Sequence, residues 1–115
     1  MSKNTILIVD DEPTQRKVFG KFISDLDHNC LTIASGMEVV DFFMNKKVIE
    51  DISSHDVDVM LLDLSMPDVD GLTVLKQIEP IKGDLQVIVL TANKDVSLAV
   101  AAINYGAIDY IVKGE

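Results

Sequence analysis

The sequence predicts a doubly wound α/β fold, in which a five-stranded parallel sheet carries helices on both faces. Two observations predict it. Short apolar runs alternate along the chain with segments whose apolar residues recur at helical spacing. The apolar runs are nearly continuous, which is typical of strands buried on both faces. Parallel strands alternating with helices are joined by right-handed crossovers, and this arrangement covers both faces of the sheet.

Length and composition fit a single folded domain. The chain has 115 residues, enough to bury a proper core. Its net charge is −9, so we expect no direct binding to nucleic acid or to an anionic membrane surface. No apolar run is long enough to span a bilayer, and the first residues carry no secretory signal. The single cysteine, Cys30, excludes an internal disulfide and suits a reducing cytosol, so a cytoplasmic location is expected.

The first half of the chain contains two predicted strand–helix units. A strand over Thr5–Val9 ends before an acidic run, and Pro13 then suits the first turn of a helix. The apolar stripe of this helix is formed by Val18, Phe19, Phe22, Ile23 and Leu26. A second strand covers residues 30–34. The helix after it is marked by Val39, Val40, Phe43 and Met44. We expect the polar tail over residues 46–55 to be solvated and mobile.

The second half repeats the alternation. A strand over residues 57–62 is followed at once by Asp63, and Pro67 and Gly71 punctuate the next loop. A short helix, ended by Pro80, has its apolar stripe at Leu72, Leu75 and Ile78. The fourth strand covers residues 85–90. The next helix carries Val96, Ala99, Val100 and Ile103, with Gly106 as its C-cap residue. The fifth strand is Asp109–Val112.

Polar side chains stand where the predicted strands end. They are Asp10, Asp11, Asp63, Thr91 and Lys113. Because the carboxyl ends of parallel strands lie at one edge of the sheet, we expect these side chains to converge. Three neighbouring carboxylates repel one another unless a cation neutralises them, and hard oxygen ligands suit Mg²⁺. Asp63 could then attack a phosphorus atom, while Lys113 and Thr91 bind the phosphoryl oxygens.

Each of these residues also has a simpler interpretation. A single acid after a strand is more often a solvated loop residue or a helix cap than a ligand. Thr91 alone would be read as an N-cap, and Lys113 alone as a surface charge. The coincidence of all five at strand ends favours a functional site.

Four stretches resemble one known family. They are Ile8-Val-Asp-Asp-Glu-Pro13, Leu62-Asp-Leu-Ser-Met-Pro67 with Gly71, Leu90-Thr-Ala92, and Tyr105-Gly-Ala-Ile-Asp-Tyr-Ile-Val-Lys113. Together they resemble the receiver domain of two-component response regulators, from the first strand almost to the last residue. The resemblance implies a flavodoxin-like sheet of order 2-1-3-4-5. It also implies phosphoryl transfer from a sensor histidine kinase or a histidine phosphotransfer protein to an aspartate, with Mg²⁺ required.

The resemblance also assigns roles to residues. Asp63 matches the phosphoacceptor, Asp11 a direct metal ligand, and Asp10 the acid that helps to position the metal and its waters. The Ser65 backbone carbonyl matches a further metal ligand. Thr91 and Lys113 match the phosphate-contacting pair, and Tyr110 matches the aromatic switch residue. Thr91 takes part in the switch as well. A protein of this kind modifies itself and is not a turnover enzyme.

Three departures from the family pattern bear on these expectations. The chain looks several residues longer between Asp11 and Asp63, and the surplus falls in the polar tail. Gly114 follows Lys113, where the family usually has a proline joined by a cis bond; a cis bond here would cost about 3 kcal/mol. The usual fifth helix is absent from this chain. We therefore expect residues 1–115 to be the N-terminal, receiver part of a longer response regulator, or to self-associate as a homodimer.

Two other functions remain open at this point. One is an aspartate-nucleophile phosphatase acting on a small phosphoester. Phosphatases of the dehalogenase type carry an aspartate two residues after the nucleophile, and Ser65 at that position argues against this function. The other is a degenerate receiver that serves only for docking, which is disfavoured because every site residue is present.

Overall fold

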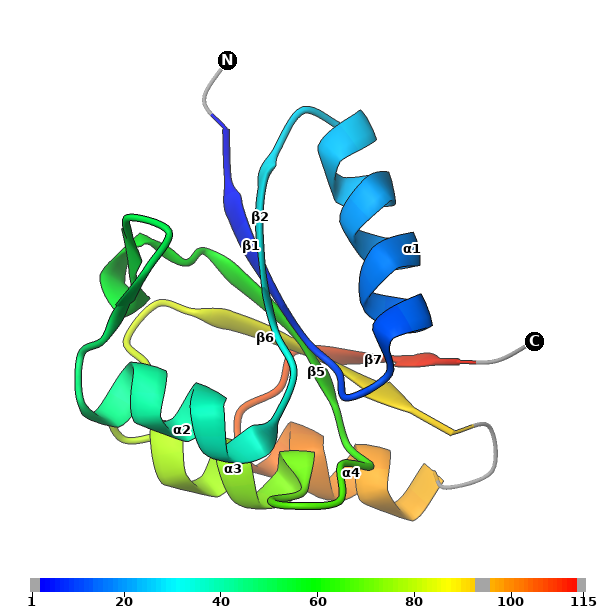
Figure 1. Ribbon diagram of the computed structural model, residues 1–115. Coiled ribbons are helices and arrows are strands. Elements are labelled where there is room, and N and C mark those ends of the chain that lie inside the picture. Colours follow the sequence, from blue (N-terminus) through cyan, green and yellow to red (C-terminus); the bar gives the residue numbers. More distant parts are fainter. Residues whose placement is uncertain (1–2, 93–95, 114–115) are drawn as a thin grey trace.

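The computed structural model describes residues 3–92 and 96–113 as a layered α/β domain (Figure 1). Its elements in chain order are β1 (Thr5–Val9), α1 (Pro13–Asp25), β2 (Asn29–Ile33), α2 (Gly36–Met44), β3 (Val48–Ile49), β4 (Ile52–Ser53), the 3-10 turn η1 (Ser54–Asp56), β5 (Val59–Asp63), α3 (Gly71–Ile78), β6 (Gln86–Thr91), α4 (Val96–Asn104) and β7 (Asp109–Val112). Gly114, which follows Lys113, lies outside the described residues, as does Asn93, which follows Ala92.

The main sheet is parallel and has the order β2-β1-β5-β6-β7. Counting only the strands of this sheet, the order is the predicted 2-1-3-4-5, so the predicted fold class is confirmed. The order reverses between β1 and β5, and in open parallel sheets ligand sites lie beside such a reversal, outside the carboxyl ends of the strands.

Local sequence explains where the helices begin. Pro13 occupies the first turn of α1, where its missing N–H costs nothing. Ser35 caps α2 by accepting a hydrogen bond from the Glu38 N–H at 3.1 Å. Asp70 caps α3 in the same way through the Thr73 N–H at 2.8 Å. These caps set the start of each helix just beyond the carboxyl ends of the strands.

The two faces of the sheet are covered unequally. The helices α2, α3 and α4 lie on one face, and α1 lies on the other (Figure 1). The first face encloses the larger core, which includes Leu7, Val9, Phe42, Met60, Leu62, Val74, Leu75, Val87 and Val89. The smaller core under α1 consists of Ile6, Ile8, Ile23, Leu61 and Leu90, with a few partly buried neighbours. The carboxyl end of β5 is therefore anchored mainly from one side.

The polar tail after α2 differs from our expectation. Instead of an entirely irregular segment, it contains an antiparallel hairpin of β3 and β4, which is followed by η1. Ile49 and Ile52 pack against the larger core and hold the hairpin down. The turn between them uses Glu50 and Asp51 with positive φ angles of 50° and 66°. The flanking lysines are exposed, as expected for a polar segment.

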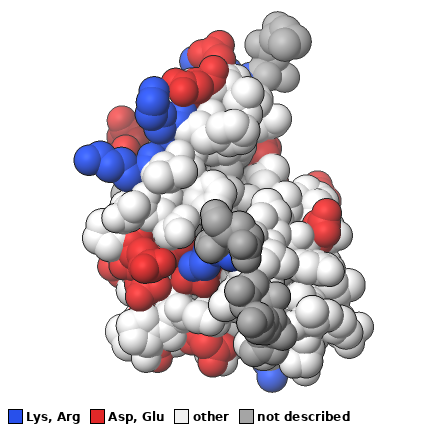
Figure 2. Space-filling view, turned by 90° about the vertical axis from the view of Figure 1, so that its right-hand side faces the viewer, with Lys and Arg blue, Asp and Glu red and all other residues white. Residues whose placement is uncertain are grey.

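The edge of the sheet at β7 is open. All four residues of this strand are exposed, including Tyr110, Ile111 and Val112 at 40%, 43% and 41%. Apolar side chains of α1 and α4 are exposed as well, among them Val18, Phe22, Val100 and Ile103. Figure 2 shows a surface of largely uncharged side chains, with several Lys and Arg residues at the upper left and others at the centre and at the lower edge. None of the helices in the described residues combines the length and hydrophobicity needed to cross a bilayer.

Candidate functional site

The polar residues predicted to converge are found at one edge of the main sheet. Asp10 and Asp11 follow β1 directly, Asp63 is the last residue of β5, and Thr91 is the last residue of β6. Lys113 follows the end of β7. The site therefore straddles the point where the strand order reverses.

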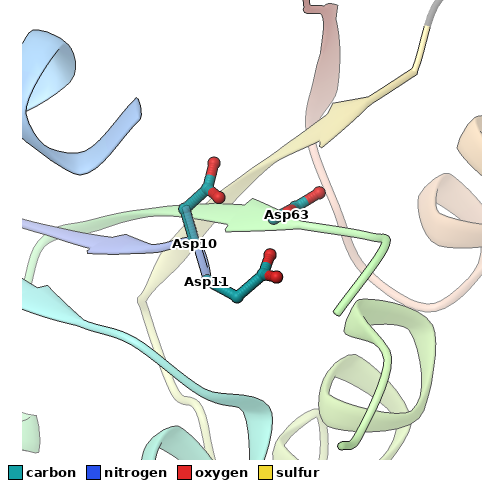
Figure 3. Close-up of side chains that lie close together, drawn as sticks. All are labelled: Asp10, Asp11 and Asp63. Carbon is teal, nitrogen blue, oxygen red and sulfur yellow. The ribbon is translucent and has the colours of Figure 1, made fainter. Parts of the chain in front are cut away.

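Three carboxylates form the centre of this edge. One carboxylate oxygen from each of Asp10, Asp11 and Asp63 lies within 4.8 Å of the other two. Figure 3 shows Asp11 and Asp63 on either side of a shared space, with Asp10 beside them. Asp10 is fully buried, Asp63 is 2% exposed and Asp11 is half-buried. A cluster of oxygen donors that is open to solvent on one side suits a hard divalent cation that retains water ligands.

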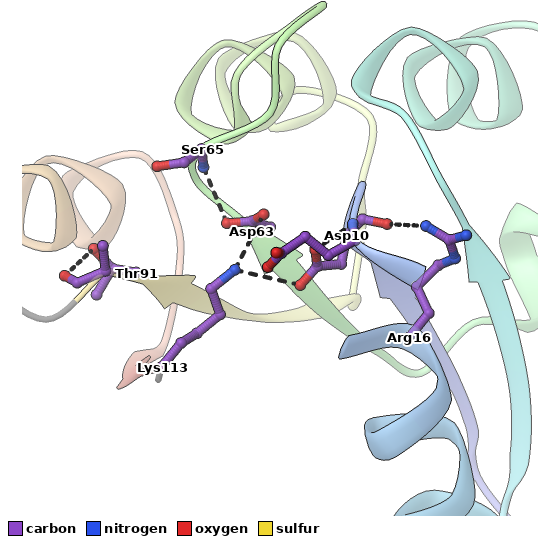
Figure 4. Close-up of polar contacts among 8 residues, drawn as sticks. Asp10, Arg16, Asp63, Ser65, Thr91 and Lys113 are labelled. Atoms are coloured by element: carbon purple, nitrogen blue, oxygen red, sulfur yellow. Dashed lines mark hydrogen bonds and ion pairs between the residues drawn. The ribbon is translucent and has the colours of Figure 1, made fainter. Parts of the chain in front are cut away.

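A lysine ammonium reaches into the same cluster. The Nζ atom of Lys113 lies 3.3 Å from Asp63 Oδ2 and 3.5 Å from Asp10 Oδ2 (Figure 4). Its side chain is only 13% exposed. This cation offsets part of the negative charge, but it contacts one oxygen of each carboxylate and leaves Asp11 without an ion pair among the described residues. The arrangement retains capacity for a further cation.

Backbone groups orient the two buried carboxylates. The Ser65 N–H donates to Asp63 Oδ1 at 3.0 Å, and the Glu12 N–H donates to Asp10 Oδ1 at 3.0 Å. The Arg16 guanidinium donates to the backbone carbonyl of Asp10 at 2.8 Å, so α1 holds the end of β1 (Figure 4). Each carboxylate thus has one oxygen fixed by the backbone and the other directed to the ammonium.

The surroundings of Asp63 raise the pKa of its carboxyl group. Burial raises the pKa of the Asp63 carboxyl to about 6, and the neighbouring Asp10 charge contributes to the rise. The Ser65 N–H and the Lys113 ammonium act in the opposite direction without cancelling it. For Lys113, burial on its own would lower the pKa of the ammonium, but Asp63 and Asp10 outweigh burial and raise this pKa. Lys113 therefore remains charged at neutral pH.

The two residues assigned to switching are in different environments. Thr91 is 3% exposed, and its hydroxyl donates to the Ala92 carbonyl at 3.2 Å. Tyr110 pairs in register with Val89 on the neighbouring strand, two residues before Thr91, and its side chain is 40% exposed. Among the described residues, the Thr91 hydroxyl thus has a local backbone partner, and the Tyr110 side chain is partly open to solvent.

Some residues that join neighbouring elements at this edge of the sheet were missed in the sequence. Arg16 was not singled out, and only its position one turn into a helix that starts beside the acids could have indicated it. Asp68 was not singled out either, although it binds the N-terminus of α2 across more than thirty residues of sequence. No local pattern indicates a contact of that range.

Comparisons with known proteins agree with this geometry. The family model of the response regulator receiver domain matches residues 6–115. The DNA-binding transcriptional regulator NtrC of Escherichia coli K12 is 35% identical over 113 residues, which are 98% of this chain and 22% of that relative. The probable C4-dicarboxylate response regulator DctR of Priestia megaterium is 32% identical over 95% of this chain and 45% of its own length. This chain therefore spans less than half of each of these relatives.

Solved structures give the same result. A response regulator receiver domain protein from Clostridium thermocellum aligns with a TM-score of 0.83 and 28% identity, over 97% of this chain and 83% of that one. The CheX–CheY–BeF3–Mg²⁺ complex from Borrelia burgdorferi aligns with a TM-score of 0.83 and 28% identity, over 97% and 79% of the two chains. Receiver domains of this family are signalling domains that bind Mg²⁺ at an acidic pocket and interact with kinases or phosphotransfer proteins. This chain belongs to the response regulator receiver domain family and functions in a two-component phosphorelay.

Proposed function

We propose that Asp63 is the phosphoacceptor of this receiver domain. The observation that carries the proposal is the convergence of three carboxylates and the Lys113 ammonium around the Asp63 side chain. A carboxylate oxygen of Asp63 attacks the phosphorus of a phosphohistidine on a sensor kinase or a histidine phosphotransfer protein. The P–N bond breaks, its electron pair returns to the imidazole nitrogen, and an acyl phosphate forms on Asp63. The domain catalyses its own modification and does not turn over a substrate.

The donor set fits Mg²⁺. Carboxylate oxygens of Asp10, Asp11 and Asp63 lie close enough together to share one ion, with Asp10 orienting it and its waters. The Ser65 backbone carbonyl, on the loop whose N–H binds Asp63, is the proposed fourth protein ligand. When bound, the ion supplies positive charge that offsets both the clustered carboxylates and the phosphoryl oxygens.

Lys113 and Thr91 complete the proposed site. The Lys113 ammonium, already 3.3 Å from Asp63 Oδ2, binds a phosphoryl oxygen once the acyl phosphate forms. The Thr91 hydroxyl leaves the Ala92 carbonyl and donates to another phosphoryl oxygen. This movement frees the space into which the exposed Tyr110 ring turns, and α4 shifts in response.

The phosphorylation proposal has a direct test. Acetyl phosphate with Mg²⁺ should add one acid-stable, base-labile phosphoryl group, which mass spectrometry detects. Asp63→Asn should abolish the addition, and a chelator should prevent it in the native chain. Asp84→Asn, which changes an exposed carboxylate in the loop before β6, is the matched control and should retain it. An unchanged mass shift in Asp63→Asn would mean that another residue is the nucleophile.

The switching proposal is tested separately. Beryllofluoride mimics the acyl phosphate, and with Mg²⁺ it should change the amide chemical shifts of α4 and β7. Thr91→Ala should leave phosphorylation largely intact but weaken these changes, since the hydroxyl is the group that moves. Amide shifts over α4 and β7 that are identical with and without beryllofluoride would contradict the switch.

We also infer a context for the domain. The exposed apolar residues of α1 and β7, and the fraction of NtrC that this chain spans, support residues 1–115 as the N-terminal, receiver part of a longer response regulator. The exposed apolar residues of α4 and β7 support a homodimer through that surface, which sedimentation over a range of concentrations would reveal. The net charge of −9 argues against direct nucleic-acid binding by this domain, and a cytoplasmic location suits its single cysteine.

A further inference from the structure

The N-terminus of α2 receives its caps from two different parts of the chain. The first turn of any helix presents N–H groups that have no partner within the helix. In α2, the Ser35 hydroxyl oxygen satisfies the third of these by accepting from the Glu38 N–H. The first two are satisfied by a single distant carboxylate, that of Asp68.

Asp68 uses both of its oxygens for this contact. The Met37 N–H donates to Oδ2 at 2.8 Å, and the Gly36 N–H donates to Oδ1 at 3.2 Å. The Met37 N–H bond is the main cause that lowers the pKa of the Asp68 carboxyl, so this group is ionised at neutral pH. An anion at this position also faces the positive end of the α2 dipole. The contact is therefore a charge-assisted clasp between a loop and a helix.

Close backbone approach reinforces the clasp. A Cβ atom on Gly36 would lie 2.1 Å from the backbone carbonyl oxygen of Val69, so this approach requires glycine at position 36. The Val69 side chain is half-buried and packs against the larger core. The middle of the loop between β5 and α3 is thus fixed against α2 by hydrogen bonds, by backbone contact and by packing.

The same loop serves the phosphoacceptor. Ser65 lies at its start and donates its N–H to Asp63 Oδ1 at 3.0 Å. The loop's other hydrogen bonds among the described residues are local, run into α3, or join Leu64 to Leu90 of β6. Asp68 alone among these connects the loop to α2. Without it, the segment from Ser65 to Val69 would lose its hydrogen bonds to that helix.

We propose that Asp68 is a positioning residue of the phosphoryl-transfer site, whose clasp on the N-terminus of α2 fixes the loop that presents Ser65 to Asp63 and to the metal. Asp68 contacts neither the acids nor the phosphoryl group, and it acts through the backbone of Ser65. This inference rests on the proposed function, because it concerns the efficiency of that same site.

The chain offers a matched control that separates positioning from helix stability. Ser35→Ala removes a cap from the same end of α2, and among the described residues the Ser35 side chain has no hydrogen bond to the loop after β5. Asp68→Ala removes a cap and the loop contact together. Asp68→Asn retains one acceptor oxygen without the charge, so it should restore part of the contact. A helix-capping role alone predicts that Ser35→Ala and Asp68→Ala behave alike.

The experiment measures Mg²⁺ affinity by calorimetry without a phosphodonor, the rate of phosphorylation by acetyl phosphate, and amide hydrogen exchange at Ser65. Substituting a residue that holds a metal ligand in place typically lowers metal affinity or activity by 10-fold or more. We expect Asp68→Ala to weaken Mg²⁺ binding and slow phosphorylation by about 10-fold, and to speed exchange at Ser65. Asp68→Asn should fall between this variant and the native chain, while Ser35→Ala should match the native chain in all three measurements.

Each result has a definite meaning. Equal Mg²⁺ affinity and rate in Asp68→Ala and the native chain overturn the positioning role, as do equal losses in Asp68→Ala and Ser35→Ala. Denaturant titration of each variant identifies losses that arise from unfolding. A native chain that neither binds Mg²⁺ nor becomes phosphorylated overturns the proposed function itself, and the Asp68 proposal with it. That failure is recognised in the native chain before any variant is compared.

Discussion

The last two residues of β5, Leu62 and Asp63, are buried almost equally, at 0% and 2% exposed, but they belong to two different regions of the protein. Leu62 lies in the closed core between the sheet and the helices α2, α3 and α4. Asp63 lies at the acidic edge, where the same strand leaves the sheet. One peptide bond separates the hydrophobic core from the candidate functional site.

Burial has opposite energetic effects in these two regions. An apolar side chain gains free energy when it leaves water, at roughly 25 cal/mol per Å² of apolar surface. A carboxylate loses free energy on burial, and the loss appears at Asp63 as a pKa raised to about 6 in spite of the Lys113 ammonium. The free-energy cost of burying Asp63 is therefore offset by the burial of apolar side chains in the core. The predictions below test this contrast, starting with the largest effect.

Leu62→Ala should lower the free energy of unfolding by about 2–5 kcal/mol. The side chain is fully buried against the larger core, so its truncation removes apolar burial and leaves a cavity. Urea denaturation followed by circular dichroism measures the change. Leu26→Ala is the matched control, because Leu26 is 54% exposed and the same truncation there should cost about 0.5 kcal/mol or less. Equal losses in the two variants would mean that burial is not the deciding factor.

Asp63→Asn should have the opposite sign and raise the free energy of unfolding by about 1–3 kcal/mol in metal-free buffer at pH 7. The substitution retains the shape of the side chain but removes a buried charge and its repulsion with Asp10. Lys113 keeps Asp10 as a partner. Denaturation with a chelator present measures the gain, and Asp84→Asn, at an exposed carboxylate, should change stability little. If Asp63→Asn lowered the free energy of unfolding, burial of the Asp63 charge would not be destabilising in the native chain.

The same gain should depend on pH. The folded-state pKa of Asp63, about 6, is above its ordinary value of about 3.9 in an unfolded chain. Between these values the folded state binds the proton more tightly, so this group makes stability fall as pH rises from about 4 to 6. The advantage of Asp63→Asn over the native chain should therefore be full above pH 6 and vanish near pH 4. A difference that is constant over this range would exclude titration of Asp63 as its cause.

The fold could be predicted because its signals are local. The apolar runs that became β1, β5 and β6 are nearly continuous, and strands of that kind fit only a sheet covered on both faces. The β3–β4 hairpin was missed for an equally physical reason. Each strand has two residues, and Glu50 and Asp51 form the turn with positive φ in place of the glycine or asparagine that would have indicated it.

The residues of the candidate site and their convergence at one edge could be predicted from the sequence, but their burial and detailed contacts could not. Residue types at strand ends were sufficient to bring Asp10, Asp63 and Lys113 to one edge, because topology alone does this. The raised pKa of Asp63 depends on how deeply the strand end is buried, which no sequence pattern records. The Asp68 clasp joins residues that are 31 and 32 positions apart in the sequence. Glycine at position 36 permits this close approach, but a glycine alone does not predict it.

The smallest effect concerns an apolar side chain that is not buried. Phe22 is 61% exposed on α1, which among the described helices is the one on its face of the sheet, so Phe22→Ser should change the free energy of unfolding of residues 1–115 by about 0.5 kcal/mol or less. Phe42→Ser, a matched change at a fully buried ring, should cost several times more.

The exposed apolar residues of α1, α4 and β7 allow the effect of burial to be tested in a longer protein as well. Apolar residues gain stability only when something covers them, and we have proposed that a following segment or a second copy of this chain covers exposed residues of α1, α4 and β7. In a chain extended past Glu115, Phe22→Ser should become measurably destabilising, because the ring would then leave water on folding. Denaturation of the extended chain measures this effect, and sedimentation of residues 1–115 tests the dimer through α4 and β7. If extension leaves the cost of Phe22→Ser unchanged and residues 1–115 stay monomeric at high concentration, the face is a solvent-exposed surface and the proposed cover is wrong.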